Sequence, residues 1–177
     1  HERSSAASDV YKRQKEDRLK GIALQTAIWR RPSPDTIPTD AKAAGLYMIC
    51  TLSKHEAEKN GYSDALMLDY KGRVSESTGS NIFFVMNGEI HTPIPDCFLN
   101  GITRKTVIDL AKSQNINVVE REIYPDEIKN ADEIFLTGSA VEVTPVGKID
   151  DQTFNVGDIT KSISELYMKT VDPNYAD

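Results

Sequence analysis

The sequence predicts an α/β or α+β fold built on one mixed sheet. Short β-favouring runs and helical patterns are interleaved along the whole chain, which is typical of a sheet with helices packed on it. With 177 residues and 39% hydrophobic side chains, the chain has about the length of one domain and enough apolar surface for a single core. No internal repeat or low-complexity tract divides it. One compact domain is therefore expected.

The first third of the chain predicts a strand, a loop and a long helix. Residues 22–29 are mostly apolar and β-favouring, whereas the Pro-rich segment 31–40 excludes a regular helix or a central strand. A helix is expected over residues 43–60, beginning just after Lys42, and Gly61 stands where a left-handed C-terminal cap would lie. The apolar residues at roughly helical spacing in this segment are Leu46, Ile49, Leu52 and Ala57.

A meander of short strands is expected next. Asn87 and Gly88 stand between two β-favouring runs and form the strongest short hairpin signal in the sequence. Lys71 and Gly72 indicate a second turn. The strands joined in this meander are expected at residues 65–68, 73–76, 81–86 and 89–92.

The remaining residues predict alternating helices and strands. Helices are expected over residues 103–112 and 159–171, with a short helix over 125–130 that begins at a proline. Strands are expected over residues 116–119 and 133–136. The inward-facing residues are expected to be Val107, Ile108, Leu110 and Ala111 in the first of these helices and Ile163, Leu166 and Tyr167 in the last.

The charge balance and the length of the apolar runs argue against two classes of partner. Twenty-one basic against twenty-seven acidic side chains give a net charge of −6, which is the wrong sign for neutralising nucleic acid phosphates. The longest strongly apolar stretches, residues 43–50 and 81–86, fall well short of the roughly 18 to 20 residues that a bilayer-spanning helix needs. No nucleic acid or membrane partner is expected, and a cytoplasmic location is predicted.

Cysteine and histidine usage predicts neither a disulfide framework nor a zinc site. The two cysteines, Cys50 and Cys97, form no C-x-x-C pair. The three histidines, His1, His55 and His91, are scattered along the chain. No bound metal is therefore expected.

The first fourteen residues are predicted to lie outside the fold. They lack the apolar core of a secretory signal, so they indicate no export. The run from Ser4 to Gln14 resembles translated adapter sequence of the kind that contaminates some assemblies. Residues 1–14 are therefore interpreted as non-native, with a native floppy tail as the alternative.

Four local features are candidates for chemistry, and each has a plain structural alternative. Lys42 lies between a rigid loop and a helix start, where the helix dipole disfavours a cation, although it could simply be solvated. Glu76–Asn81 is a small-residue turn with a carboxylate and an amide at its ends, although it could simply be a turn that connects two strands. Leu99–Thr103 could hold an anion at a helix N-terminus, or Thr103 could only cap that helix. Thr137–Ala140 offers hydroxyls and amides, or is only a turn.

Taken together, these features closely resemble the class IV pyridoxal-phosphate aminotransferases, and among them the branched-chain amino acid aminotransferases. Four motifs occur in the family's order and spacing, and the resemblance covers nearly all of the chain after its first residues. The stretches that carry it are Ile37–Tyr47, Glu76–Phe83, Leu99–Arg104 and Phe135–Val146. The resemblance implies transamination of leucine, isoleucine and valine with 2-oxoglutarate, and hence small amino acid and 2-oxo acid substrates.

The resemblance also implies pyridoxal 5′-phosphate as the cofactor and assigns residues to it. Lys42 would be the catalytic residue, binding the cofactor covalently through its amine and later moving a proton, which requires a neutral amine. Glu76 would keep the ring nitrogen protonated, and Tyr47 would hydrogen-bond the ring hydroxyl. The implied cofactor-binding residues are Lys42, Tyr47, Glu76, Asn81, Leu99, Ile102, Thr103 and Ser139, and the implied substrate-binding residues are Ser139 and Ala140. No metal is implied.

A fold and a domain organisation follow from the same resemblance. Residues 15–177 would form the large C-terminal domain of the D-amino acid aminotransferase-like fold, a mixed sheet folded into a partial barrel with flanking helices. The smaller N-terminal domain is expected to be missing, together with an arginine that it contributes to the cofactor phosphate. The chain by itself is therefore expected to be inactive, and the full-length protein is expected to be a homo-oligomer.

Three other functions stay open at this point. A D-amino acid aminotransferase shares the lysine, the glutamate and the phosphate loops, although Pro38–Lys42 and Thr137–Ala140 look more like the branched-chain branch. A lyase acting on aminodeoxychorismate is a weaker candidate. A non-catalytic domain of this fold is the alternative from a different class, but it would have no physical reason to keep Lys42 together with Glu76. The preference among the three branched-chain amino acids also stays open.

Overall fold

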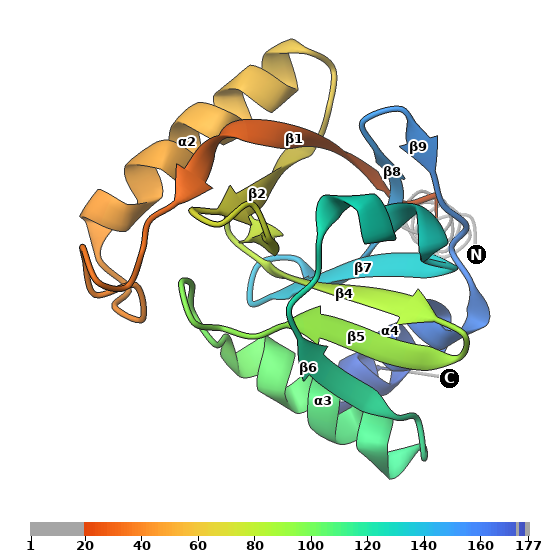
Figure 1. Ribbon diagram of the computed structural model, residues 1–177. Helices are drawn as coiled ribbons and strands as arrows, with labels where there is room; N and C mark the ends of the chain where they lie inside the picture. Colours follow the sequence, from red (N-terminus) through yellow and green to blue (C-terminus); the bar gives the residue numbers. More distant parts are fainter. Residues whose placement is uncertain (1–19, 173, 176–177) are drawn as a thin grey trace, which may run out of the picture.

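The computed structural model describes residues 20–172 and 174–175, in which nine strands form one mixed sheet (Figure 1). The strands are β1 (Ile22–Arg31), β2 (Asp64–Asp69), β3 (Val74–Ser77), β4 (Asn81–Met86), β5 (Glu89–Pro93), β6 (Val118–Arg121), β7 (Glu133–Gly138), β8 (Glu142–Ile149) and β9 (Gln152–Thr153). The helices are α2 (Ala44–Lys59), α3 (Ile102–Ser113) and α4 (Asp158–Val171), with a short 3-10 helix, η1 (Pro125–Asn130). The segment predicted to be a non-native tail, residues 1–14, lies outside the described residues.

One extra strand pairing turns this sheet into a barrel. The strand order is β3-β2-β1-β8-β7-β4-β5-β6, and β3 also pairs with β4. The ring β1, β2, β3, β4, β7 and β8 is therefore closed, while β5 and β6 extend the sheet from β4 and β9 pairs with β8. Pairs β1–β2, β1–β8 and β5–β6 are parallel and the others are antiparallel. The predicted mixed sheet with flanking helices is confirmed, and its barrel is closed rather than partial.

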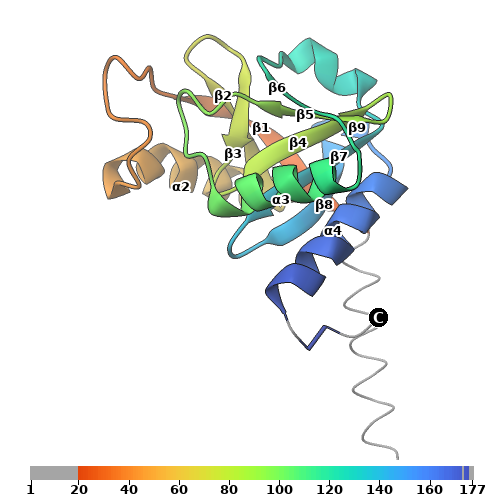
Figure 2. The ribbon, with the colours of Figure 1, turned by 90° about the horizontal axis from the view of Figure 1, so that it is seen from below.

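Helices cover the barrel on two sides (Figure 2). α2 packs on β1 and β2, whereas α3 and α4 contact each other and pack on β7. α4 also packs on β8. Among the described residues, no helix has both the length and the apolar character that crossing a membrane would require.

Each face of the sheet has its own apolar cluster, because successive side chains of a strand point to opposite faces. Ile82 and Phe84 of β4 fill the barrel interior together with residues of the other barrel strands. Phe83 faces the other way, into the layer under α3 and α4, where its ring stacks on that of Phe135 with a centroid separation of 4.9 Å. Burial on both faces explains why β4 reads as a continuous apolar run.

The inward face of α2 differs from the apolar pattern of its sequence. Its buried residues are Leu46, Cys50, Ser53 and Ala57, at intervals of four, three and four residues. Leu52, which belonged to the expected apolar set, is 47% exposed. The C-terminal turn follows the prediction, since Gly61 has a φ of 84° and a glycine adopts this conformation without strain.

Strand β8 is the main element that the sequence analysis missed. It contains Pro145 and Gly147, which argue against a strand in the middle of a sheet. Residues 142–145 pair with β7, with Pro145 opposite Phe135, whereas residues 146–149 pair with β1 and β9. Pro145 thus lies where β8 exchanges one neighbour for the other, so the missing amide hydrogen disrupts no continuous ladder.

A carboxylate from β7 caps the N-terminus of α4. Glu133 is buried, and its Oε2 accepts a hydrogen bond of 2.7 Å from the amide of Thr160, while Oε1 accepts one of 3.3 Å from the amide of Ile159. The N-cap residue itself is Gly157, which provides no side chain. A Cβ at Gly157 would collide with the Glu133 carboxylate, so this close approach requires a glycine.

We expect Glu133→Ala to destabilise the protein by about 1 to 3 kcal/mol, because it leaves two helix amides and their partial positive charge without a partner. The measurement is urea unfolding followed by circular dichroism. Glu165→Ala, which alters an exposed glutamate on the same helix, is the matched control and should change stability by less than about 0.5 kcal/mol. Equal effects of the two substitutions would contradict the capping role.

Candidate active site

The structure places Glu76, Asn81 and Thr137 in one row across three strands. Glu76 of β3 lies opposite Asn81 of β4, and Asn81 lies opposite Thr137 of β7. A tight turn over Ser77–Ser80 joins the first two strands and is closed by a 2.8 Å hydrogen bond from the amide of Ser77 to the carbonyl of Ser80. Two of the predicted motifs therefore meet at one edge of the barrel.

Glu76 is a buried carboxyl group with one partner of opposite charge. It is 8% exposed, and its Oε1 lies 3.4 Å from Nε of Arg31. Burial raises the pKa of Glu76 to about 8, although the guanidinium of Arg31 acts to lower it. Within the described residues, its second oxygen, Oε2, makes no hydrogen bond or ion pair. Glu76 can therefore exchange a proton near neutral pH and has one oxygen available to a ligand.

Tyr47 shares the electrostatic environment of Glu76. It lies on the first turn of α2 and is partly buried. Burial raises the pKa of its phenol, the negative charge of Glu76 raises it further, and Arg31 lowers it. The phenol therefore stays protonated and can donate a hydrogen bond at neutral pH. The two side chains that were predicted to bind the ring nitrogen and the ring hydroxyl are brought together.

The N-terminus of α3 has no side-chain cap. Gly101 is the N-cap residue, and Ile102 begins the helix one residue earlier than expected. Thr103 lies inside the first turn, is buried and makes no capping hydrogen bond, so the alternative that Thr103 only caps the helix is wrong. Amides of the first turn carry partial positive charge and can bind an anion. Ile102 would act there through its backbone, because its side chain is 82% exposed.

Asn81 holds the loop that leads into α3. Its Nδ2 donates a 2.9 Å hydrogen bond to the carbonyl of Leu99, and its Oδ1 accepts a 3.2 Å hydrogen bond from the amide of Gly101. A Cβ at Gly101 would lie 2.5 Å from that Oδ1, so the loop approaches Asn81 this closely only because residue 101 is a glycine. The contacts of Asn81 thus position the loop, whereas the sequence analysis expected Asn81 to bind the cofactor.

Ser139 and Ala140 lie exposed in the turn between β7 and β8. The preceding Gly138 packs on the Ser77–Ser80 turn, since a Cβ there would lie 3.2 Å from the hydroxyl oxygen of Ser80. The hydroxyl of Thr137 is buried and has no hydrogen-bond partner among the described residues. The Ser139 motif therefore lies beside the ends of β3 and β4, with its own side chains open to solvent.

Lys42 lies in the loop before α2, and its side chain is exposed. It precedes Ala43, the N-cap residue of α2, whose side chain makes no capping hydrogen bond. The loop is attached to the body of the protein by Thr39, whose hydroxyl donates a 3.2 Å hydrogen bond to the carbonyl of Asp96. Lys42 makes no hydrogen bond or ion pair with another residue of the described part, so its amine is open to a ligand.

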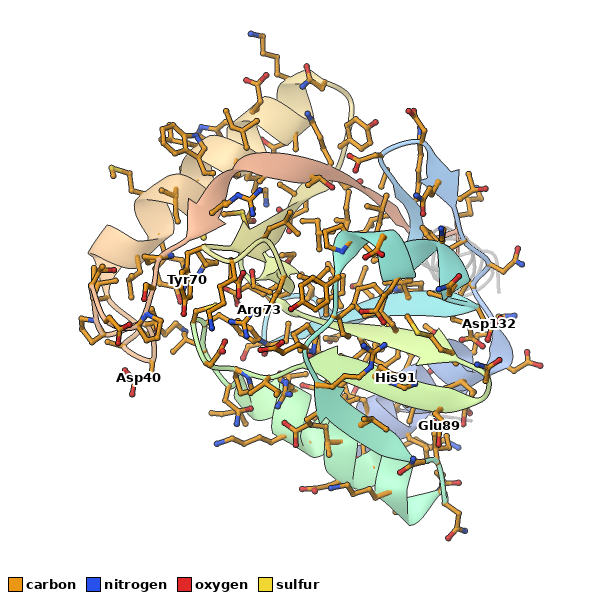
Figure 3. The ribbon with its side chains drawn as sticks, in the orientation of Figure 1. Asp40, Tyr70, Arg73, Glu89, His91 and Asp132 are labelled. Atoms are coloured by element: carbon orange, nitrogen blue, oxygen red, sulfur yellow. The ribbon has the colours of Figure 1, made fainter. Side chains whose placement is uncertain are left out.

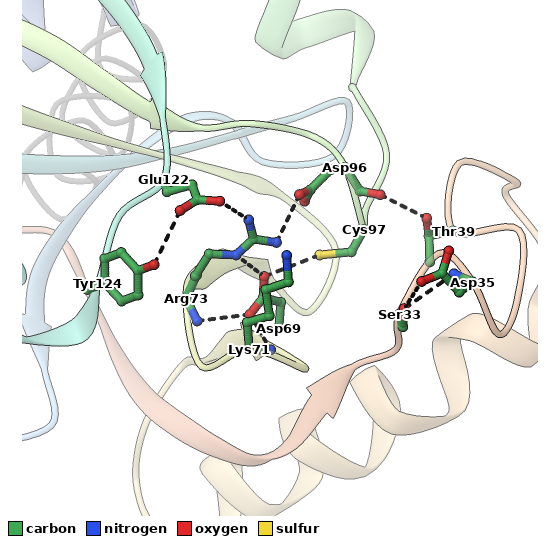
Figure 4. Close-up of polar contacts among 10 residues, drawn as sticks. All are labelled: Ser33, Asp35, Thr39, Asp69, Lys71, Arg73, Asp96, Cys97, Glu122 and Tyr124. Atoms are coloured by element: carbon green, nitrogen blue, oxygen red, sulfur yellow. Dashed lines mark hydrogen bonds and ion pairs between the residues drawn. The ribbon is translucent and has the colours of Figure 1, made fainter.

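Arg73 anchors the loop before α3, which contains the Asp96 that binds Thr39 (Figure 3; close-up in Figure 4). This buried guanidinium contacts Asp69 at 2.5 Å, Asp96 at 2.8 Å and Glu122 at 2.5 Å. Burial acts to lower the pKa of Arg73, but hydrogen bonds to three carboxylates outweigh it and raise the pKa above its usual value, so the side chain stays charged. The network joins the β2–β3 turn, the loop before α3 and the residue after β6.

A cysteine lies beside this network but does not make it a metal site. One ligand atom each of Asp69, Asp96 and Cys97 fall within 4.8 Å of one another. Arg73, however, already pairs with both carboxylates, and burial raises the pKa of the Cys97 thiol to about 12. A protonated thiol beside a guanidinium does not attract a cation.

Sequence reasoning did not find the two buried arginines, Arg31 and Arg73. The available signal was weak: Arg31 ends an apolar run directly before a proline, and Arg73 follows Asp69 by four residues across a Lys-Gly turn. The second pattern points to Asp69 alone, whereas Asp96 and Glu122, the other partners of Arg73, and Glu76, the partner of Arg31, lie far away in the sequence.

A sequence model of the family described as "Amino-transferase class IV" matches residues 4–149, which is more than half of the chain. This chain belongs to the class IV aminotransferases. A protein of Aquifex aeolicus named "Probable branched-chain-amino-acid aminotransferase" is 43% identical to it over 160 residues, covering 88% of this chain and 51% of that protein. A protein of the same name from Rickettsia felis is 45% identical over 131 residues, covering 74% of this chain and 45% of that protein.

Solved structures show the same fold as this class IV aminotransferase chain. The branched-chain aminotransferase from the thermophilic archaeon Thermoproteus uzoniensis, solved with norvaline, matches with a TM-score of 0.83 and 39% identity, over 85% of this chain and 51% of that chain. An aminotransferase from Brucella abortus bound to the cofactor PLP matches with a TM-score of 0.81 and 38% identity. The match covers 85% of this chain and 54% of that chain. The chain thus spans about half the length of the relatives that it matches.

Glu76→Gln should change the pH dependence of stability of this class IV aminotransferase chain. The pKa of Glu76 is 4.5 in an unperturbed chain and about 8 in the folded one, so between these values the folded state keeps a proton that the unfolded state has lost. The contribution of Glu76 to the free energy of unfolding therefore falls as pH rises from about 4.5 to about 8.

In Glu76→Gln this fall should be absent, so the variant should gain stability relative to the wild type as pH increases. Urea unfolding at about pH 5, 6.5 and 8 measures it. Glu165→Gln, an exposed glutamate on α4, is the control and should follow the wild-type curve. Parallel curves for Glu76→Gln and the wild type would show that Glu76 titrates normally.

Proposed function

We propose that this chain is the lysine-bearing part of a branched-chain amino acid aminotransferase, which uses pyridoxal 5′-phosphate to transaminate leucine, isoleucine and valine with 2-oxoglutarate. The observation that carries the proposal is that the buried carboxyl group of Glu76 lies near enough to the partly buried phenol of Tyr47 to act on its pKa, beside the row of β3, β4 and β7. The names of the relatives from Aquifex aeolicus and Rickettsia felis support the same substrate class. Class IV membership supports the cofactor.

The residues present fit such a cofactor. A protonated ring nitrogen needs a buried acceptor, and Glu76 has Oε2 unengaged among the described residues. A ring hydroxyl needs a neighbouring donor, which the protonated phenol of Tyr47 provides. A phosphate dianion needs amides and hydroxyls without competing carboxylates, and the uncapped first turn of α3 contains no acidic residue.

When bound, pyridoxal 5′-phosphate supplies an electron-withdrawing ring that stabilises negative charge at the substrate's Cα. Glu76 would hold a proton at the ring nitrogen through Oε2, and Tyr47 would donate to the ring hydroxyl oxygen. Amides and hydroxyls of Ile102, Thr103 and Ser139 would hold the phosphate, with Leu99 and Asn81 shaping the loop. The N–H of Ala140 would bind the substrate carboxylate together with Ser139.

Lys42 would bind the cofactor covalently through Nζ and afterwards carry the proton at the substrate's Cα. Its loop is well suited to this, because Thr39 and Asp96 hold it at one side while Nζ has no competing partner in the described part of the chain. Proton transfer by a positioned base contributes about 10² to 10⁴ in rate, so Lys42 is the residue whose loss should cost most.

The partners and the location of the protein are also part of this proposal. Small amino acids and 2-oxo acids would be its substrates, and the full-length protein would be a homo-oligomer. The absence of a nucleic acid or membrane partner and the cytoplasmic location rest on composition alone. The domain division at residues 15–177, with a separate N-terminal domain that completes the site, rests on the resemblance.

We expect pyridoxal 5′-phosphate and borohydride to label Lys42. A mixture of the chain with the cofactor is reduced, digested and analysed by mass spectrometry, and the phosphopyridoxyl group should reside on the peptide containing Lys42. Lys42→Ala should abolish specific labelling, whereas Lys54→Ala, which removes an exposed lysine of α2, should leave it unchanged. Labelling spread evenly over the lysines would count against the proposed site.

Substrate class is tested with the chain completed by the N-terminal half of the Aquifex aeolicus relative. L-leucine with 2-oxoglutarate should be converted at least about tenfold better than D-alanine, because a pocket shaped for one side chain and one chirality discriminates by about 1 to 3 kcal/mol or more. The measurement is the formation of glutamate. A preference for D-alanine would indicate a D-amino acid aminotransferase instead, and no turnover of either substrate despite labelling of Lys42 would favour a different function.

A further inference from the structure

Arg31 is a buried guanidinium at the end of β1 whose contacts converge on the proposed site. It is 3% exposed. Its Nε lies 3.4 Å from Oε1 of Glu76 and donates a 3.3 Å hydrogen bond to the carbonyl of Cys97. Its Nη1 donates a 3.1 Å hydrogen bond to the carbonyl of Leu46 and lies 3.5 Å from Sγ of Cys50.

These contacts connect three segments that would each hold a different part of the cofactor. Glu76, at the end of β3, would bind the ring nitrogen. The carbonyl of Leu46 belongs to the peptide bond that precedes Tyr47, so this contact holds the turn of α2 that presents the phenol. The carbonyl of Cys97 lies two residues before Leu99, in the loop that leads to the uncapped end of α3. One side chain therefore touches the ring-nitrogen, ring-hydroxyl and phosphate segments together.

The way in which Arg31 contacts Glu76 leaves the carboxylate half free. An arginine can bind both oxygens of a carboxylate through two parallel hydrogen bonds. Here the contact with the carboxylate joins Nε to Oε1 alone, and Nη1 donates to the carbonyl of Leu46 on α2. Within the described residues Oε2 has no partner. The arrangement stabilises negative charge on Glu76 and still leaves room for a second cation at Oε2.

The other titratable groups near Glu76 do not replace this charge. They are Tyr47 and Cys50, both on α2, and burial raises the pKa of each, so both are neutral at neutral pH. Arg31 is the charged side chain that acts on Glu76 among the described residues. Burial disfavours the charged carboxylate, and Arg31 opposes that effect on the pKa.

We propose that Arg31 is a positioning residue of the cofactor site: it holds Glu76 by Oε1, favours its ionised form, and keeps Oε2 free for the protonated ring nitrogen of the cofactor. Its remaining hydrogen bonds hold α2 and the Cys97 loop in register with that carboxylate. The proposal rests on the proposed function for the identity of the ligand, but the coupling between Arg31 and Glu76 belongs to the chain itself. A purely structural arginine would affect stability without controlling the titration of Glu76.

The experiment follows the Glu76 carboxyl carbon by ¹³C NMR in the cofactor-free chain, as pH is varied, with Glu76→Gln to assign the resonance. In Arg31→Met the titration midpoint should rise by about one to three pH units relative to the wild type, because an opposite charge at this distance has been removed. Arg31→Lys, which keeps the charge, should raise it less. Arg121→Met is the control: it removes an arginine that is paired with Glu127, and it should leave the Glu76 midpoint unchanged.

A wild-type measurement covers the case in which Arg31→Met does not fold. The Nε–H resonance of Arg31 should move with the same midpoint as the Glu76 carboxyl carbon, and it should stop moving in Glu76→Gln. The proposal is overturned if the Arg31 resonance does not shift as Glu76 titrates, or if Arg31→Met folds and the titration midpoint of Glu76 is unchanged.

A second readout concerns the ligand. Pyridoxal 5′-phosphate should bind Arg31→Met at least about tenfold more weakly than the wild type, measured by the quenching of intrinsic fluorescence, and equal affinity would also overturn the role given to Arg31. If Lys42 is not labelled but the titrations of Arg31 and Glu76 are coupled, the proposed function is contradicted and the role of Arg31 in controlling Glu76 is not. If Lys42 is labelled but the titrations are not coupled, the role of Arg31 is contradicted and the proposed function is not.

Discussion

The pairing of β3 with β4, made by Glu76 opposite Asn81, is the constraint on which the rest of the site depends. It closes the barrel and fixes two chemically different side chains next to each other at one edge. The turn between them is too short to allow another register, because the amide of Ser77 already bonds to the carbonyl of Ser80. From this pair the site extends to Arg31 and Tyr47 on one side and to the loop before α3 on the other.

Two buried arginines near this edge show how the same kind of charge can serve stability or chemistry. Burying a charge is costly unless it is paired and hydrogen-bonded. Arg73 contacts three carboxylates, so its network is saturated and works as an anchor. Arg31 has one carboxylate, Glu76, and otherwise bonds to two carbonyls and a thiol. Glu76 is paired with this one cation through Oε1, and its Oε2 has no partner among the described residues.

The irregular segments of the site are held by side chains from other parts of the chain. The loop between β5 and α3 is attached through the carboxylate of Asp96 to Arg73 and through its carbonyl to Thr39 (Figure 4). Closer to α3, the side-chain amide of Asn81 makes two hydrogen bonds to the same loop, one with the carbonyl of Leu99 and one with the amide of Gly101. Loops positioned in this way on a closed barrel combine exposed backbone amides with a fixed geometry, which is what the binding of a phosphate requires.

The sequence by itself determined most helices and strands and the turn at Asn87, because periodicity and turn chemistry are local properties. The roles proposed for Lys42 and Glu76 come instead from the resemblance of their motifs to those of the class IV aminotransferases. Tertiary structure alone decided that β8 is a strand, since Pro145 is acceptable only where two partner strands meet. It also decided the partners of the buried charges: Arg31 reaches Glu76, and Arg73 reaches Glu122, which is 49 residues away in the sequence. The strength of a charge interaction depends on distance and burial in the folded chain, and neither quantity is encoded in the residues that flank an arginine.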